Sequence, residues 1–119
     1  MTRPVYELKA AFFKTLGHPA RIRILEVLRD GPANVADIAE IVGVSGSTLS
    51  QHLATLRRAE VIRSERQGSL LIYEVVDPRV FSLLEIGRQM LTTSLEGSQE
   101  LLADLEEMAA PSAPAAKMR

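Results

Sequence analysis

The chain has 119 residues, which fits one compact domain and little more. It is 46% hydrophobic and 24% charged, which excludes wholesale disorder, and it has no Cys, which excludes a disulfide scaffold, a thiolate metal site and a cysteine nucleophile. The net charge of −1 hides an asymmetry: residues 1–79 hold 11 Lys/Arg and 9 Asp/Glu, residues 80–119 hold 3 and 6, and an anion-binding surface is therefore expected in the first two thirds.

Two amphipathic helices are predicted in the N-terminal part of the chain. The first covers Val5 to Leu16, whose apolar residues recur at helical spacing and include Leu8 and Phe12. The second covers Pro19 to Arg29, since Pro is well tolerated in a first helical turn. We expect it to turn three apolar side chains inward and two arginines outward: Ile22, Leu25 and Leu28 against Arg21 and Arg29.

Two shorter helices follow, separated by a tight break at Gly43-Val44. Asn34 is predicted to cap a helix over residues 35–42 (VADIAEIV), and Ser45 a helix that ends near Arg58 or Ala59. This last helix has one apolar face of three leucines: Leu49, Leu53 and Leu56. Its other face bears only uncharged side chains that form hydrogen bonds: Ser47, Thr48, Ser50, Gln51 and Thr55.

The amino-acid composition changes after Glu60. Residues 61–76 (VIRSERQGSLLIYEVV) are rich in β-branched and aliphatic residues around Gln67-Gly68, which predicts a short β-hairpin. Asp77-Pro78 then opens a long helix from Arg79 to about Met108, with leucines near seven-residue spacing: Leu84, Leu91, Leu95, Leu102 and Leu105. The predicted fold is mainly α with a small β-hairpin, as one domain over residues 1–109 and a flexible Pro/Ala/Ser-rich tail over residues 110–119.

Two short helices joined by about three residues that include a Gly are typical of a helix-turn-helix, whose second helix enters the DNA major groove. Base edges require hydrogen-bonding side chains there. The candidates for base contacts are Ser47, Thr48, Ser50, Gln51, His52 and Thr55. Ser45 with the helix N-terminus suits a phosphate. Four arginines at the helix end and along the hairpin are candidates for the DNA backbone: Arg57, Arg58, Arg63 and Arg66.

This order of elements resembles the ArsR/SmtB family of winged-helix transcriptional repressors. The matching stretches are HPARIRIL (residues 18–25), STLSQHLATLRRAEVI (47–62), RQG (66–68) and IYEV (72–75), and the resemblance covers roughly residues 8–91. It implies a winged helix-turn-helix with Gly68 at the wing tip, and a homodimer that binds an inverted-repeat DNA operator until an effector arrives. A long helix overhangs so small a domain, so we expect the terminal helices to pair through Leu8, Phe12, Leu84, Leu91, Leu95 and Leu102.

The chain departs from the family at its sensing sites. Members that sense thiophilic metals carry Cys in the helix that matches residues 35–42, which has none here. Others bind zinc or nickel through His and acidic residues on the last helix, but no His follows Asp77. Persulfide sensors of the family need a Cys pair, which this chain lacks. We therefore expect no metal and no cofactor, and an effector, if there is one, that is a small molecule in an apolar crevice between the terminal helices or a competing protein.

Several residues keep a second interpretation. His52 is either a base or phosphate contact or a helix-packing imidazole, and His18 is a hydrogen-bonding residue at a turn or between helices rather than a metal ligand. Asp37 and Glu40 are expected on a solvated helix face. No nucleophile with its base and no phosphate-cradling loop is recognisable, so we expect no enzyme. With no apolar run of transmembrane length, we expect a cytoplasmic protein.

The alternative function is a winged-helix module for protein interaction or dimerisation that does not bind DNA. The low net charge supports it.

Overall fold

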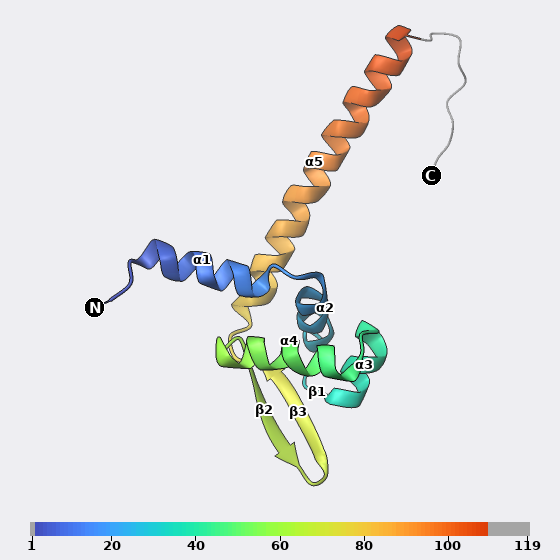
Figure 1. Cartoon of the computed structure of the whole chain (residues 1–119). Helices are drawn as coiled ribbons and strands as arrows, with labels where there is room; N and C mark the ends of the chain where they lie inside the picture. The colour runs from blue at the N-terminus through green and yellow to red at the C-terminus, as the bar shows by residue number, and fades with distance from the viewer. Residues whose placement is uncertain (1, 110–119) are drawn as a thin grey trace. The chain divides into compact units, whose positions relative to one another are not determined.

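The computed structural model describes residues 2–109. Five helices and three short strands follow one another along the chain (Figure 1): α1 (Val5–Leu16), α2 (Pro19–Leu28), β1 (Ala33–Asn34), α3 (Val35–Val42), α4 (Gly46–Arg58), β2 (Ile62–Gln67), β3 (Leu70–Val75) and α5 (Arg79–Ala109). The chain divides into two compact units, of which the first ends at Phe81 and the second begins at Ser82. The helices and the hairpin predicted from the sequence are confirmed.

Side-chain caps fix where α2, α3 and α4 begin. His18 Nδ1 accepts a hydrogen bond from the Ala20 N–H at 3.1 Å, at the start of α2. Asn34 Oδ1 accepts from the Asp37 N–H at 2.8 Å and so caps α3, as predicted. Helix α3 ends at Gly43, whose φ of 78° lies in the left-handed region that favours glycine. This turn separates α3 from α4.

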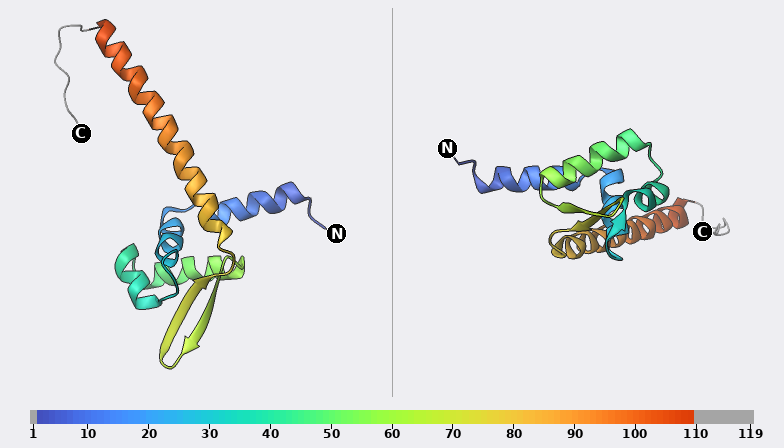
Figure 2. Two further views of the ribbon diagram at one scale, coloured as in Figure 1. Left: turned by 180° about the vertical axis from the view of Figure 1, so that it is seen from behind. Right: turned by 90° about the horizontal axis from the view of Figure 1, so that it is seen from below.

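The sheet has three antiparallel strands in the order β1-β3-β2. Strands β2 and β3 pair from Ile62–Val75 to Gln67–Leu70, and Gly68, at a φ of 63°, takes the first position of the two-residue turn between them. Figures 1 and 2 show this hairpin projecting from the helices with its turn at the free tip. Strand β1 was not predicted, because two residues are too short to show an alternating pattern.

The core of the first unit lies between α2, α3, α4 and the start of β2. Seven side chains are essentially inaccessible to solvent: Ile24, Leu25, Ile38, Leu49, Leu53, Leu56 and Ile62. Burying each of these aliphatic side chains contributes about 1.5–3 kcal/mol relative to exposure. Together they join the two helices of the helix-turn-helix to α2 and to the wing formed by β2 and β3.

Two expectations for α2 were wrong. Ile22 is only half-buried, whereas Ile24 is fully buried. Arg21 is half-buried rather than outward. The reason is helical geometry: Arg21 precedes Ile24 by three residues and Leu25 by four, so its stem shares their face, which packs on α3, α4 and β3.

The second unit consists of the part of α5 from Ser82 onward. On its polar side, Arg88 Nη2 forms an ion pair with Glu85 Oε2 at 2.7 Å. Most of its large apolar side chains are exposed. In the part of the chain that the structure describes, no helix has the length and apolarity of a membrane span. The predicted tail over residues 110–119 lies outside the described residues.

Candidate nucleic-acid interface

Helix α4 is held to the first unit by its apolar face. Leu49, Leu53 and Leu56 are at most 2% exposed, and the helix packs on α2 and on β2. Ser47 and Gln51, each two positions from Leu49, lie about 160° around the helix from it and must point outward, because a helix turns about 100° per residue. Ser47, Ser50 and Gln51 are exposed. The sequence pattern predicted this division of α4 into a buried and an exposed face, and it is confirmed.

The exposed face of α4 offers hydrogen bonds without charge until its last turn. The hydroxyls of Ser47 and Ser50 donate and accept, and the Gln51 amide does both in a fixed plane. This chemistry matches base edges in the major groove, where a planar amide can form two hydrogen bonds with adenine. No Asp or Glu lies within α4 to repel a phosphate.

Three other hydroxyls of this region already have partners. Ser45 Oγ accepts from the Thr48 N–H at 3.4 Å and donates to Thr48 Oγ1 at 2.9 Å, so both side chains belong to the N-cap. Thr55 is half-buried and its Oγ1 accepts from Arg58 Nη2 at 3.5 Å. Ser45, Thr48 and Thr55 therefore shape the ends and flank of the helix, while Ser47, Ser50 and Gln51 are free to meet a ligand.

His52 lies on the flank of α4 that faces α2. It is half-buried, and its ring centroid is 4.3 Å from that of His18, with the planes tilted by 48°. Its pKa is lowered from the ordinary value of 6.5, first by burial and then by the charges of His18 and Arg21. This geometry supports the helix-packing interpretation of His52, because a neutral, half-buried imidazole is a poor partner for a phosphate.

Neither the His18–His52 contact nor the place of Arg21 was anticipated from the sequence. Arg21 Nε is buried, and no described residue forms a hydrogen bond with it. Its spacing from Ile24 and Leu25 could have placed Arg21 on the buried face of α2, whereas the histidine contact joins residues 34 positions apart and leaves no local signal. His18 is the helix-start and interhelix residue that the sequence predicted.

The four candidate arginines do not form one equivalent set. Arg57 and Arg58 are exposed in the last turn of α4. Arg63 Nε donates to Glu74 Oε2 at 3.0 Å across the hairpin. Arg66 is exposed, and no ion pair involves it among the described residues. Residues 63 and 66 are an odd number of positions apart, so these two side chains leave opposite faces of β2.

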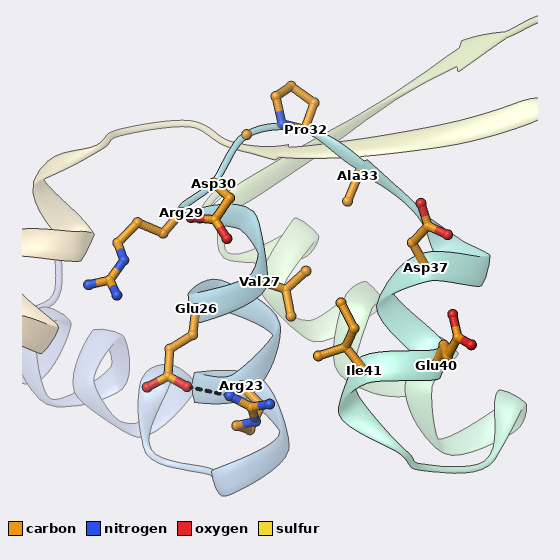
Figure 3. Close-up of a pocket in the computed structure, with 11 residues that line it drawn as sticks. Arg23, Glu26, Val27, Arg29, Asp30, Pro32, Ala33, Asp37, Glu40 and Ile41 are labelled. Carbon is orange, nitrogen blue, oxygen red and sulfur yellow. Dashed lines mark hydrogen bonds and ion pairs between the residues drawn. The ribbon is translucent and has the colours of Figure 1, made fainter.

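A hollow of about 610 Å³ lies elsewhere in the first unit, between the end of α2, the turn after it and α3 (Figure 3). Val27 and Ile41 point toward each other across it, and an ion pair of 2.9 Å joins Arg23 to Glu26 at its side. None of its lining residues belongs to α4 or to the wing. Asp37 and Glu40, at its α3 side, are exposed and lie on a solvated helix face as predicted.

No metal centre is formed by the residues that the structure describes: nowhere among them do three or more His, Cys, Asp or Glu side chains come together. His18 and His52 are adjacent, but they supply two donors beside the permanent positive charge of Arg21.

Comparisons with known proteins agree with this geometry. The profile of the family described as "Bacterial regulatory protein, arsR family" matches residues 18–64, from the cap of α2 into β2. The HTH-type transcriptional regulator Rv0081 of Mycobacterium tuberculosis is 44% identical over 105 residues, 87% of this chain and 92% of the relative. Its crystal structure matches with a TM-score of 0.74 at 44% identity, over 82% of this chain and 98% of that chain.

Two further proteins extend the likeness. The solution structure of the homodimeric winged helix-turn-helix DNA-binding domain Mb0332 from Mycobacterium bovis has a TM-score of 0.65 at 25% identity, over 71% of this chain and 82% of that chain. The transcriptional repressor SdpR of Bacillus subtilis is 38% identical over 63 residues, 53% of this chain and 70% of the relative. The chain therefore belongs to the ArsR family, and it is, as predicted, a winged helix-turn-helix transcriptional regulator that binds DNA and not an enzyme.

Proposed function

We propose that the chain is a homodimeric repressor that binds an inverted-repeat operator through α4 in the major groove. The observation that carries this proposal is the exposed face of α4, which has hydrogen-bonding side chains at its centre and, at its end, two arginines that form no ion pair among the described residues. A dimer presents two such helices, so two half-sites about one helical turn apart are expected. SdpR, which the chain resembles, is a repressor by name, and this supports the direction of regulation.

Within this proposal, Ser47, Ser50 and Gln51 form the base contacts. Thr48, His52 and Thr55 lie at the flank of α4 and support its position. Ser45 shapes the helix N-terminus, whose backbone N–H groups and dipole favour a phosphate.

The DNA backbone would meet arginines on both sides of α4. Arg57, Arg58 and Arg66 have charges that no ion pair balances among the described residues. Arg63 contributes less, because Glu74 already engages it. Gly68 has no side chain at the wing tip, so the backbone there can approach a duplex closely.

We assign dimerisation to the terminal helices. On α1, Leu8 and Phe12 are 48% and 39% exposed. On α5, Leu91, Leu95 and Leu102 are between 58% and 67% exposed. Leu84, on the same helix, is half-buried. Leu84, Leu91, Leu95 and Leu102 follow one another at steps of seven, four and seven residues, which gives one seam along a helix. A second copy would cover this seam, and the homodimeric state of Mb0332 supports that choice of partner.

In domain terms, residues 1–109 form the DNA-binding and dimerisation domain in this proposal. The effector, if there is one, is a small molecule or a competing protein rather than a thiophilic metal, because the chain has no Cys. A chromosomal operator as the target implies that the protein acts in the cytoplasm.

The test is selection of bound duplexes from a random-sequence pool, followed by affinity measurements at rising salt concentration and light scattering of the complex. We expect a palindromic motif, one dimer per duplex and an affinity that falls as salt rises. A folded protein that selects no sequence and shows no salt-dependent binding would instead support the interaction module without DNA binding.

A further inference from the structure

Three side chains meet where α2 supports the recognition helix, and we call them the histidine joint: His18, Arg21 and His52. His18 and Arg21 come from the start of α2, and His52 from the middle of α4. The two imidazole centroids are 4.3 Å apart. All three residues are half-buried, and Arg21 Nε is buried with no hydrogen-bond partner in the described part of the chain. The contact between α2 and α4 is thus built partly from groups that carry or can gain positive charge.

An additional proton in the histidine joint is unfavourable for reasons of hydrogen bonding and charge. A neutral imidazole keeps one acceptor nitrogen, whereas an imidazolium has two donors and no acceptor. His18 already uses Nδ1 to accept from the Ala20 N–H at 3.1 Å, so a proton on Nδ1 would remove the cap of α2. A proton on His52 would put a second full charge beside Arg21, whose buried Nε has no hydrogen-bond partner among the described residues.

The groups whose charge acts on His52 are both on α2. They are His18 and Arg21, and burial adds to their effect in lowering the pKa of His52. Helix α1 and strand β2 also pack on α4, but among the described residues neither contributes a charge that acts on His52. Among the described residues, the charges that act on His52 therefore include no carboxylate.

We propose that His18 and Arg21 are positioning residues that hold the recognition helix through a neutral His52, so that protonation of the joint loosens α4 and weakens binding to the operator. This inference rests on the proposed function of α4. The exposed face of α4 reads bases only while its apolar face keeps one orientation, and the joint lies beside that apolar face. Acidification would therefore reduce specific binding more than non-specific attraction to phosphates.

The direction in which DNA affinity changes with pH separates this positioning role from direct contact with DNA. If His52 or His18 touched a phosphate, a proton would strengthen binding and affinity would rise on acidification. In the joint the same proton is unfavourable. Because the pKa of His52 is lowered in the folded protein, the unfolded chain binds more protons as the pH falls below 6.5, and stability is lost in that direction.

The experiment compares the full-length protein with His18→Asn, His52→Gln and Arg23→Gln. Asn keeps an oxygen to cap α2, and Gln keeps a polar side chain of similar size that does not titrate. Arg23 is exposed on the same helix, paired with Glu26, and serves as the matched control. The probes are a duplex selected by the wild-type protein at about pH 7.5 and a random duplex, measured down to about pH 5.5, which spans the range where His changes charge.

For the wild type and Arg23→Gln, affinity for the selected duplex should fall by up to about tenfold, the effect of one fully linked proton over one pH unit. Affinity for the random duplex should not fall. His18→Asn and His52→Gln should lose most of this pH dependence. A wild-type affinity that is constant or rises on acidification would overturn the proposal, as would an unchanged pH profile in both histidine variants.

The melting temperature of the DNA-free protein gives an independent arm. It should fall on acidification more in the wild type than in His52→Gln, and equal falls would also count against the joint. If no duplex is selected at about pH 7.5, the proposed function fails, while this thermal arm still decides whether the joint titrates. Melting at the same pH also shows whether each variant is folded, and either histidine variant suffices for the comparison.

Discussion

Arg63 and Glu74 lie directly opposite each other on β2 and β3, and Arg63 Nε is 3.0 Å from Glu74 Oε2. The pair is exposed, so it contributes at most about 1 kcal/mol to stability. Its larger consequence is electrostatic: the charge of Arg63 is already balanced within the wing. Arg66, three residues further along the same strand, leaves the other face of the hairpin, and no ion pair among the described residues involves it.

Arg66→Ala should weaken binding to all duplexes alike, because a phosphate contact carries no sequence information. The slope of log affinity against log salt should decrease by about one unit, the signature of one lost phosphate contact. Arg63→Ala is the matched control on the same strand and should change the slope less. Equal slopes for Arg66→Ala and the wild type would show that Arg66 does not touch the backbone.

Gln51→Ala should reduce binding to the operator by about 1–3 kcal/mol at one base position and relax the preference there. The reason is that Gln51 is exposed at the centre of the uncharged face of α4, and its amide can pair with a base edge in two hydrogen bonds. Competition with duplexes that vary each position in turn measures both effects. Equal losses on operator and random DNA would assign Gln51 to the backbone instead.

The sequence predicted most of the local structure because the signals are local. Asn34 and Ser45 are caps three residues before the N–H groups that they accept from, and Leu49, Leu53 and Leu56 share a face by spacing alone. The exposed side chains of α4 follow from that face. Helix boundaries and the exposed face of α4 were therefore accessible without a structure.

The remaining features depend on contacts between distant segments. His52 lies beside His18, and Arg63 beside Glu74, and neither pair is visible in the periodicity of its own element. The same holds for β1, whose two residues become a strand only because Ala33 and Asn34 pair with Tyr73 and Ile72. Tertiary packing, rather than local propensity, decides which polar side chains remain available to a ligand.

Leu91→Asp should give a monomer or an aggregate that does not bind the operator. Leu91 is 67% exposed within one copy, and in the proposed dimer the substitution would bury an unpaired carboxylate, which is severely destabilising. Thr93→Asp is the control, since it adds the same charge two residues away, on a side of α5 that turns away from the leucine seam. Light scattering measures the mass of each variant. A stable dimer after Leu91→Asp would remove α5 from the interface.

Zinc, nickel, cobalt and arsenite should not release the protein from its operator. Tight sites for such ions rely on thiolates or on several His and carboxylate donors in fixed geometry, and the chain has no Cys and only two His. His18 and His52 are neighbours, but Arg21 acts on the same spot as a fixed positive charge, which opposes a metal cation.

A site on α5 would have to use carboxylates such as Glu85, Glu96 and Glu100, which favour hard ions and bind them weakly. Glu85 is also engaged by Arg88. The measurement is titration of the operator complex with each metal at about micromolar concentration, a range in which dedicated sensor sites are filled. We expect an unchanged DNA affinity and no stoichiometric metal on the dimer. Release of DNA with metal bound would contradict this prediction. The effector would then be a metal ion, with its site among the carboxylates of α5, rather than a small molecule or a competing protein.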